Sequence, residues 1–268
     1  MRSPVSVGRA LSIGAALTLL AGCSGSGGSG SPLSPSGVGA ALHPSSSQAA
    51  LRSCAANTNA ANVPFPGVPL GTDATFAVLG GSTVTNAGPT VLTGNLGVYP
   101  GTSITGFGPG VVNGTIYAGG PVAAQAQHDL GTAYGNALRR KNPHALPDDI
   151  GGMTITPGLY KPTATLGISG NVTLDGKNNP NAVFIFQIGT TLITGVNSSV
   201  TLINKARACN VFWAVGSSAT LGTGSTFSGV IFAFTSVTLD TGANVEGRVL
   251  AQNGAVTLLS NIVTEPSP

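Results

Sequence analysis

The sequence predicts an all-β solenoid, in which short strands coil around one axis, with one long α-helix packed alongside. A Thr-Leu pair returns in the C-terminal part at intervals of 18, 29, 18 and 19 residues: Thr173-Leu174, Thr191-Leu192, Thr220-Leu221, Thr238-Leu239 and Thr257-Leu258. A coil this short cannot bury its own apolar face, so successive coils must stack. The second observation is one helical apolar stripe at about residues 121–140. The third is a composition dominated by Gly, Thr, Ser, Asn and β-branched residues, which suits strands and tight turns.

The composition limits the possible classes of function. The chain has 268 residues, 40 of them Gly, and only 7% are charged, so it is not a charge-driven disordered chain. The formal charge is +3, and without Arg2 and Arg9 it falls to about +1, with nine basic against eight acidic residues. Nucleic-acid binding requires a basic stripe that releases counterions, so we expect no nucleic-acid partner.

The N-terminus is expected to be a signal peptide of the lipoprotein type that spans residues 1–22. Arg2 and Arg9 precede an apolar run from Leu11 to Ala21, which is too short for a membrane-spanning helix. The run ends in Leu20-Ala21-Gly22-Cys23, which resembles a bacterial lipobox, where the cysteine becomes the lipidated first residue. The alternative is an ordinary signal peptide with a chance cysteine.

A flexible tether rich in Gly, Ser and Pro is expected at residues 23–50, followed by the folded domain at 51–268. We therefore expect an exported protein, lipid-anchored at the bacterial cell envelope or extracellular, whose only membrane contact is the lipid. The oxidising compartment permits a disulfide between Cys54 and Cys209. The alternative is two unpaired thiols, with Cys209 a small buried apolar residue.

Short segments punctuated by Gly and Pro predict the coils of the solenoid. Strands are expected at residues 74–79 and 82–85, and after the helix at 153–156, 158–161, 172–174, 183–187, 211–215, 230–234 and 248–251. The last four are continuous apolar runs, which are typical of strands buried on both faces. Their aromatic side chains are therefore expected in the core: Phe184, Phe186, Phe212, Trp213, Phe232 and Phe234.

The helix at about residues 121–140 is predicted to lie along one side of the solenoid, because a lone helix cannot bury its apolar stripe. Pro121 suits the first turn and Pro143 ends the helix. Gly131 and Gly135 weaken it by about 1 kcal/mol each relative to Ala, and would permit close approach to a flat sheet. The apolar stripe consists of Val122, Ala126, Leu130, Ala133, Tyr134, Ala137 and Leu138.

Residues suited to catalysis are scattered along the chain. His43, His128 and His144 are not spaced as metal ligands, and no Cys pair joins them. Asp148-Asp149 is adjacent, as in a solvated loop or helix cap, and there is no phosphate loop or nucleophile elbow. We expect no enzyme activity, no metal and no cofactor.

A second repeated motif points instead to a surface. Thr194-Gly195-Val196-Asn197 recurs as Thr223-Gly224-Ser225-Thr226 and as Thr241-Gly242-Ala243-Asn244, at intervals of 29 and 18 residues. If these segments stack, Thr and Asn form rows of short polar groups on rungs about 4.7–4.9 Å apart, a repeat close to that of the ice lattice. The alternative is that these residues simply make turns between strands.

The chain resembles the microbial ice-binding (antifreeze) proteins from about Leu70 to Thr264. The resemblance is carried by segments 79–85, 97–101, 146–149, 156–160, 174–176, 181–187, 209–213, 222–227 and 254–258. It implies a discontinuous, right-handed, three-sided β-helix with the helix along one side. It also implies adsorption to ice through a Thr-(Ala/Gly)-x-(Thr/Asn) pattern, matched here by Thr194, Asn197, Thr223, Thr226, Thr241 and Asn244.

The sequence thus favours an ice-binding protein, acting as a monomer, that slows ice growth or recrystallisation. Thr93-Gly94-Asn95 and Thr163-Ala164-Thr165 match the pattern only in part, so the earlier coils are expected to contribute weakly. The alternative function is a surface adhesin or structural β-solenoid module that keeps the fold without ice activity.

Overall fold

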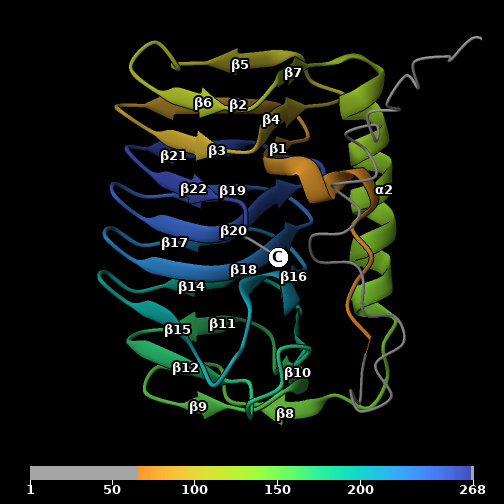
Figure 1. The fold of residues 1–268 in the computed structure, drawn as a ribbon, viewed down its shortest axis with the longest axis vertical. Helices are drawn as coiled ribbons and strands as arrows, with labels where there is room; N and C mark the ends of the chain where they lie inside the picture. The colour runs from red at the N-terminus through yellow and green to blue at the C-terminus, as the bar shows by residue number, and fades with distance from the viewer. Residues whose placement is uncertain (1–65, 267–268) are drawn as a thin grey trace, which may run out of the picture. The chain divides into compact units, whose positions relative to one another are not determined.

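A computed structural model describes residues 66–266 and shows parallel strands stacked along one axis, with one long helix beside them (Figure 1). The prediction of a β-solenoid with a helix alongside is confirmed. The expected signal peptide, the tether, Cys23 and Cys54 lie outside the described residues. Within the described part of the chain, no helix combines the length and the apolar character required to cross a membrane.

The described elements are one α-helix, two 3-10 helices and 22 short strands. The helices are η1 (Gly71–Thr75), α2 (Gly120–Leu138) and η2 (Ala208–Asn210). The strands before α2 are β1 (Phe76–Gly80), β2 (Thr83–Ala87), β3 (Val91–Thr93), β4 (Asn95–Val98), β5 (Ser103–Thr105), β6 (Val111–Asn113) and β7 (Ile116–Ala118). Those after it are β8 (His144–Leu146), β9 (Thr154–Ile155), β10 (Gly158–Pro162), β11 (Leu166–Ile168), β12 (Asn171–Asp175), β13 (Phe184–Ile188), β14 (Leu192–Thr194), β15 (Ser199–Ile203), β16 (Val211–Val215), β17 (Ala219–Leu221), β18 (Thr226–Ala233), β19 (Val237–Leu239), β20 (Asn244–Ala251), β21 (Val256–Leu259) and β22 (Ile262–Thr264).

The strands form a seven-stranded and a 15-stranded sheet. The seven-stranded sheet has the order β11-β14-β17-β19-β21-β2-β5, and we call it the threonine sheet for reasons given below. The larger sheet has two rows of strands. The outer row contains β9, β12, β15, β22, β3 and β6, the helix-side row contains β8, β10, β13, β16, β1, β4 and β7, and the long strands β18 and β20 run through both.

The stack does not follow the order of the chain. The strands of the C-terminal coil, β20, β21 and β22, pair with β1, β2 and β3, which come near the start of the described chain. Helix α2 then carries the chain from β7 at one end of the stack to β8 at the other (Figure 1). The expected discontinuity of the solenoid is therefore present.

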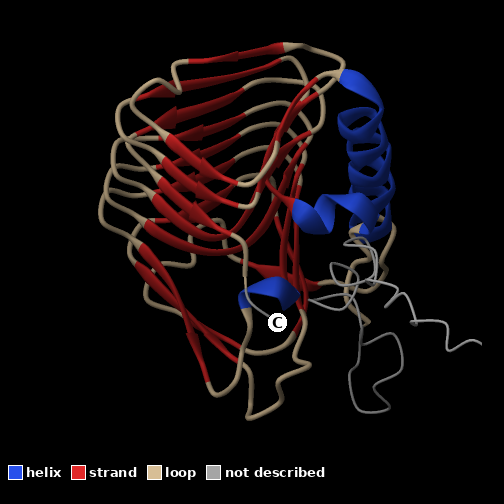
Figure 2. Ribbon diagram, turned by 45° about the horizontal axis from the view of Figure 1, so that its top comes forward, coloured by secondary structure: helices blue, strands red, loops and turns tan. Residues whose placement is uncertain are grey.

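The central strands of the helix-side row, β1, β13 and β16, are buried on both faces, which explains their continuous apolar sequences. One face of each strand points into the solenoid, where the rings of Phe186 and Trp213 stack with centroids 4.0 Å apart. The other face lies under α2 (Figure 2) and includes Phe212 and Phe232. Five of the six aromatic residues predicted in the core are buried there, but Phe234 is 48% exposed because it follows the last residue of β18.

Helix α2 agrees closely with the predicted range, but its buried face is rotated from the predicted stripe. Val122 and Leu138 are exposed, whereas Gln127 is buried. The Gln127 amide donates hydrogen bonds of 3.0 Å to the carbonyls of Gly80 and Ala251. A search for apolar periodicity could not find Gln127, because it is a polar residue that is buried through its hydrogen bonds to backbone carbonyls of the sheet.

A second glutamine anchors the end of the helix. Gln187, on β13, donates to the carbonyls of Ala137, Leu138 and Arg140 at 2.8, 3.2 and 3.0 Å. The first two are among the last carbonyls of α2, which have no partner within the helix, and the third follows the C-cap residue Arg139. Of the two glycines expected to permit close approach, Gly131 faces the Gln252 side chain, whereas Gly135 faces only Arg139 of its own helix.

A buried charged cluster joins the start, the last coil and the end of the described chain. Arg248, on β20, is fully buried; it donates to the carbonyl of Ala74 and lies 4.0 Å from the Glu265 carboxylate. Burial, assisted by the nearby Asp129 carboxylate, raises the pKa of Asp73 well above its usual value, and Arg248 only partly offsets this. Burial also raises the pKa of Glu265. Three distant segments therefore meet around one guanidinium group.

We predict that Gln127→Ala lowers the free energy of unfolding by about 2 kcal/mol, because it removes the two buried hydrogen bonds to the carbonyls of Gly80 and Ala251. Urea unfolding followed by circular dichroism measures the change. Gln125→Ala is the matched control, because Gln125 lies on the exposed side of the same helix. Equal losses in the two variants would show that the hydrogen bonds of Gln127 do not secure the helix to the sheet.

We predict that Asp73→Asn stabilises the protein at pH 7 and that this gain disappears near pH 3. Because the folded state raises the pKa of Asp73, it binds the proton more tightly than the unfolded chain does. The carboxyl group therefore reduces stability increasingly as the pH rises from about 3.9, its unfolded value, through the raised folded pKa. Unfolding free energies of the variant and the parent at the two pH values test this.

Asp129→Asn is the control with the opposite sign. Burial alone would raise the pKa of Asp129, but hydrogen bonds from Thr72 and Gln125 outweigh it and lower that pKa. Its carboxylate therefore stabilises the fold at neutral pH, and the contribution is lost as the pH falls through the folded pKa. An Asp73→Asn protein less stable than the parent at pH 7 would mean that attraction to Arg248 dominates at this site.

Candidate functional site

Four of the six predicted surface residues stack as expected. Thr226 and Asn244 are register partners at the starts of β18 and β20. Thr223 and Thr241 are exposed on the turns that lead into these strands, and the amide of Gly224 donates to the carbonyl of Thr241 at 3.0 Å. The last two copies of the motif therefore lie side by side at the edge between the threonine sheet and the outer row.

The first copy of the motif does not join them in register. Pairing joins Ile193 to Thr220 and Ser199 to Thr226, so this coil spans 27 residues rather than the 29 that separate the motifs. The motif at Thr194 therefore begins two residues earlier in its coil than the motif at Thr223 does in the next coil. The position that matches Thr226 on β15 is Ser199, not Asn197.

Thr194 and Asn197 have local structural roles. Thr194 is only 4% exposed, and its hydroxyl accepts a 2.9 Å hydrogen bond from the amide of Gly222. Asn197 is exposed with a φ of 56°, a left-handed conformation that Asn tolerates in turns. The expectation that Thr194 presents its side chain on the surface is corrected by its burial.

A larger array of threonines lies on the seven-stranded sheet. In the Thr-Leu pairs of β17, β19 and β21, the leucines are fully buried, so alternation turns the threonines outward. Strands β2 and β5 continue this column, although they precede α2 in the sequence. From the β5 end it reads Thr105, Thr85, Thr257, Thr238, Thr220, Ile193 and Gly167.

The column is continuous across the break in chain order. Thr85 and Thr257 are 172 residues apart in sequence, yet their hydroxyl oxygens are 3.5 Å apart. None of the six strand pairings of this sheet, all among described residues, shows a shift in register. Five threonines therefore occupy five consecutive rungs.

A second column runs beside the first, two residues earlier in the sequence. Ser103 and Thr83 lie on strands β5 and β2, and each of the other members directly precedes its strand. These side chains are small, at least partly exposed and uncharged: Ser103, Thr83, Ala255, Ser236, Ser218, Thr191 and Thr165. The two columns give the threonine sheet an outward face made largely of hydroxyls and methyl groups.

The sequence analysis used the Thr-Leu repeat as a signal of the fold and missed its outward half as a surface. Only the last three pairs are in register, since Leu192 pairs with Ala219 and Thr173 lies on the outer row. The earlier coils were expected to contribute weakly, but they supply Thr83, Thr85, Ser103 and Thr105 to this face. The alternating Ser82-Thr83-Val84-Thr85 and Ser103-Ile104-Thr105 was the available signal.

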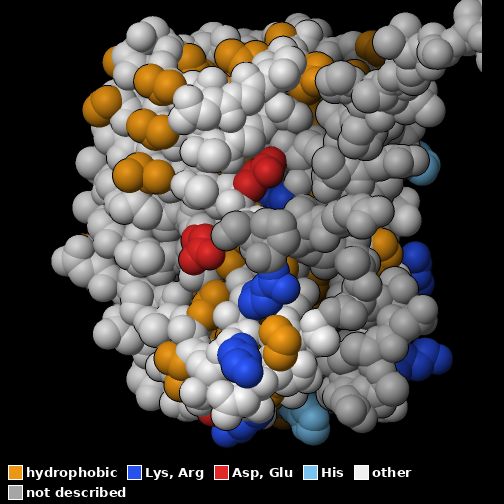
Figure 3. Space-filling view, in the orientation of Figure 1, with side chains coloured by type: hydrophobic (Ala, Val, Ile, Leu, Met, Phe, Trp, Pro, Cys, Tyr) orange, Lys and Arg blue, Asp and Glu red, His pale blue; other side chains and the backbone are white. Residues whose placement is uncertain are grey.

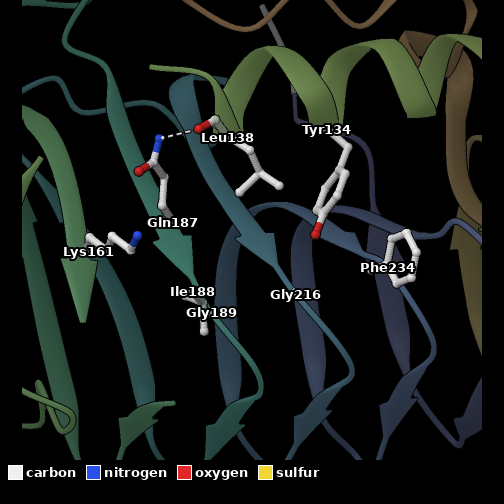
Figure 4. Close-up of a pocket in the computed structure, with 8 residues that line it drawn as sticks. All are labelled: Tyr134, Leu138, Lys161, Gln187, Ile188, Gly189, Gly216 and Phe234. Carbon is white, nitrogen blue, oxygen red and sulfur yellow. Dashed lines mark hydrogen bonds between the residues drawn. The ribbon is translucent and has the colours of Figure 1, made fainter. Parts of the chain in front are cut away.

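The groove between α2 and the sheet offers little chemistry. It encloses about 500 Å³ and is lined by Tyr134, Leu138, Lys161, Gln187, Ile188, Gly189, Gly216 and Phe234 (Figure 4). Lys161 is the one charged side chain among them, and the Gln187 amide is bound to helix carbonyls. The other titratable group is the Tyr134 phenol, whose pKa is raised by burial and whose hydroxyl donates a 3.4 Å hydrogen bond to the carbonyl of Val215.

The described residues contain no group of three or more His, Cys, Asp or Glu side chains that could hold a metal ion. Cys209 is buried, and its expected partner Cys54 lies outside the described residues, so the disulfide stays a prediction. The threonine sheet and its edge are thus the most regular functional surface of the described chain.

Known proteins are similar to this chain in both sequence and fold. The sequence model of the ice-binding-like family matches residues 78–264. An ice-binding protein of Nostoc sp. is 54% identical over 197 residues, which cover 73% of this chain and 73% of that protein. The matched region includes every strand from β2 to β22, and therefore both parts of the discontinuous stack.

Solved structures agree in fold. The crystal structure of an ice-binding protein from an Antarctic biological consortium is 46% identical, with a TM-score of 0.74 over 75% of this chain and 92% of that one. The ice-binding protein of the Antarctic ascomycete Antarctomyces psychrotrophicus is 40% identical, with a TM-score of 0.73 over 75% of this chain and all of that one.

Proposed function

The chain belongs to the ice-binding-like family, and we propose that it adsorbs to ice crystals through the outward face of the threonine sheet. The observation that carries this proposal is the column of threonines on five consecutive rungs, from Thr105 to Thr220. Adsorption on such a face slows the growth or recrystallisation of ice and requires no catalytic group or cofactor.

The chemistry of the face suits a solid made of water. Adjacent rungs of a sheet lie about 4.7–4.9 Å apart, which is close to a repeat of the ice lattice. The β-branched Thr side chain has a restricted χ1, so its hydroxyl and methyl positions repeat from rung to rung. The methyl groups favour leaving liquid water, while the hydroxyls hold ordered water. The outward positions carry no charge that would order water in another geometry.

The edge beside the threonine sheet extends the proposed contact. Thr223, Thr241, Thr226 and Asn244 repeat there on adjacent rungs, and the exposed Asn197 lies next to them. We assign them a supporting role, because they lie on turns and at the starts of strands rather than in the centre of a sheet. Thr194 has no direct role, because its hydroxyl is buried.

The finer features of the protein are also proposals. We propose three flat sides and a right-handed winding, since each winding visits the threonine sheet, the outer row and the helix-side row in turn. We propose a domain of about residues 51–268 that acts as a monomer outside the cell. Residues 1–22 are proposed as its signal peptide and 23–50 as its tether, with lipid on Cys23.

We predict that Thr238→Tyr abolishes most of the ice activity, because a phenol ring at the centre of the column holds neighbouring rungs away from a planar crystal. The loss of contact on neighbouring rungs has the size of an interface hot spot, about 2 kcal/mol, so the activity should fall at least about tenfold. Ice-recrystallisation inhibition and ice-affinity partition measure it. Circular dichroism verifies that the variant is folded.

Thr201→Tyr is the matched control, because Thr201 is exposed on β15 in the outer row. It should leave ice activity unchanged. Thr223→Tyr with Thr241→Tyr should reduce activity only partly. Loss of activity in this edge variant, with full activity in Thr238→Tyr, would move the ice contact from the threonine sheet to its edge. An inactive parent with cell-adhesion activity would favour the adhesin alternative.

We predict that the mature protein produced in a bacterial host begins at Cys23 and carries a diacylglycerol group on its sulfur, because the apolar run ends in a lipobox-like sequence. Intact-mass spectrometry of the mature protein tests this. Cys23→Ala should release the protein from the membrane fraction. An unmodified N-terminus elsewhere would identify an ordinary signal peptide.

A further inference from the structure

The charges of the domain are segregated along the solenoid axis. Seven of the eight Lys and Arg residues in the described chain lie between residues 139 and 207, together with only three of its eight acidic residues. This part comprises the coils from β8 to β15 and the segments that join them. The remainder holds five acidic residues and the buried Arg248. In Figure 3, blue side chains accordingly gather over the lower part of the visible face.

We call these seven residues the basic end: Arg139, Arg140, Lys141, Lys161, Lys177, Lys205 and Arg207. None is fully buried, and Lys141, Lys161 and Lys205 are exposed. Exposed lysines over one end of a small domain create a local positive potential even though the net charge of the chain is small.

The acidic residues in the same region are engaged in local bonds. Asp149 accepts hydrogen bonds from the amides of Gly151 and Ser169, at 2.9 and 3.1 Å. Asp148 accepts one from the amide of Thr163, and Asp175 lies 2.9 Å from the ammonium group of Lys177. These carboxylates organise loops and pair with one lysine, so the exposed Lys141, Lys161 and Lys205 remain available to an external anion.

The described chain also begins at this end. Arg140 donates hydrogen bonds to the carbonyls of Pro66 and Gly67. Residues before 66, which include the lipobox-like sequence at Cys23, are therefore connected to the domain beside Arg139, Arg140 and Lys141. The concentration of basic residues and the start of the described chain are two separate observations, and both lie at the basic end.

We infer that the basic end docks on an anionic phospholipid surface and orients the anchored domain so that its threonine sheet extends away from that surface. This inference rests on the proposed lipid attachment and ice binding. Each Lys or Arg near such a surface contributes about 1 kcal/mol, and the attraction extends over about one Debye length, roughly 8–10 Å. The threonine sheet runs along the stack from β11 towards β5, so docking at the basic end leaves most of its rungs open.

Vesicle co-sedimentation of the full chain carrying Cys23→Ala tests the inference without a covalent lipid. The vesicles are pure phosphatidylcholine, or phosphatidylcholine with about a quarter phosphatidylglycerol. We expect at least about tenfold tighter binding to the anionic vesicles at about 0.05 M salt, and loss of this preference at about 0.5 M. Any binding through the apolar run Leu11–Ala21 is common to both vesicle types and cancels in the comparison.

Two variants that lower the net charge by the same three units locate the effect. Lys141→Gln, Lys161→Gln and Lys205→Gln together should remove most of the anionic preference. Asn113→Glu, Thr115→Glu and Ala118→Glu, at the opposite end of the stack, should leave it within about twofold. Equal binding to both vesicle types, equal loss in both variants, or retention on an anionic polysaccharide without vesicle preference would overturn the inference.

Ice-recrystallisation inhibition is measured on the same preparations. The lysine variant should retain it, because none of the three lysines lies on the threonine sheet. A parent that prefers anionic vesicles but does not affect ice would refute the proposed function and leave the docking inference standing. The reverse result would refute the docking alone.

Discussion

In-register stacking of parallel strands across the break in chain order is the constraint on which the rest of the structure depends. The coil formed by β20, β21 and β22 comes last among the described strands, yet it lies inside the stack rather than at its end. Its strands pair with β1, β2 and β3. Only this junction brings Thr85 beside Thr257 and joins two separate groups of threonines into one column. A slip of one residue at the junction would turn the buried Val84 outward and interrupt both the core and the surface.

The junction is secured from the side by polar groups rather than by apolar packing alone. Gln127 binds the carbonyls of Gly80 and Ala251, which end β1 and β20, so one amide spans the two strands that meet there. Arg248 similarly joins β20 to the segment before β1 and to Glu265. Burial of polar groups of this kind costs free energy, and the cost is larger in any arrangement of the coils that loses these hydrogen bonds, so the groups favour the observed arrangement.

These features explain which parts of the structure could be predicted from the sequence. The Thr-Leu repeat revealed the last three coils because consecutive windings are neighbours there and alternation sends Thr outward and Leu inward. The N-terminal coils could not be assigned to the same face by interval, because Thr85 follows Thr257 in space but precedes it by 172 residues in the chain. The motif at Thr194 led to a wrong assignment because it occupies a different position in its coil from the later copies. The same residue types therefore have different orientations there. Gln127 was missed because the stripe was sought among apolar residues.

The three rows of strands differ in burial and in the kinds of side chain that they expose. The central strands of the helix-side row are apolar on both faces because α2 covers them, so they offer little surface. The outer row carries charge, such as Glu246, and at least partly exposed apolar side chains, among which Ile262, Val91 and Val111 lie in register on three neighbouring rungs. The threonine sheet alone combines an apolar inner face with a small, uncharged and repeating outer face. Because the coils share backbone hydrogen bonds along the whole stack, the spacing of its hydroxyls is set by the sheet rather than by individual side chains, and a surface of many weak contacts needs that regularity.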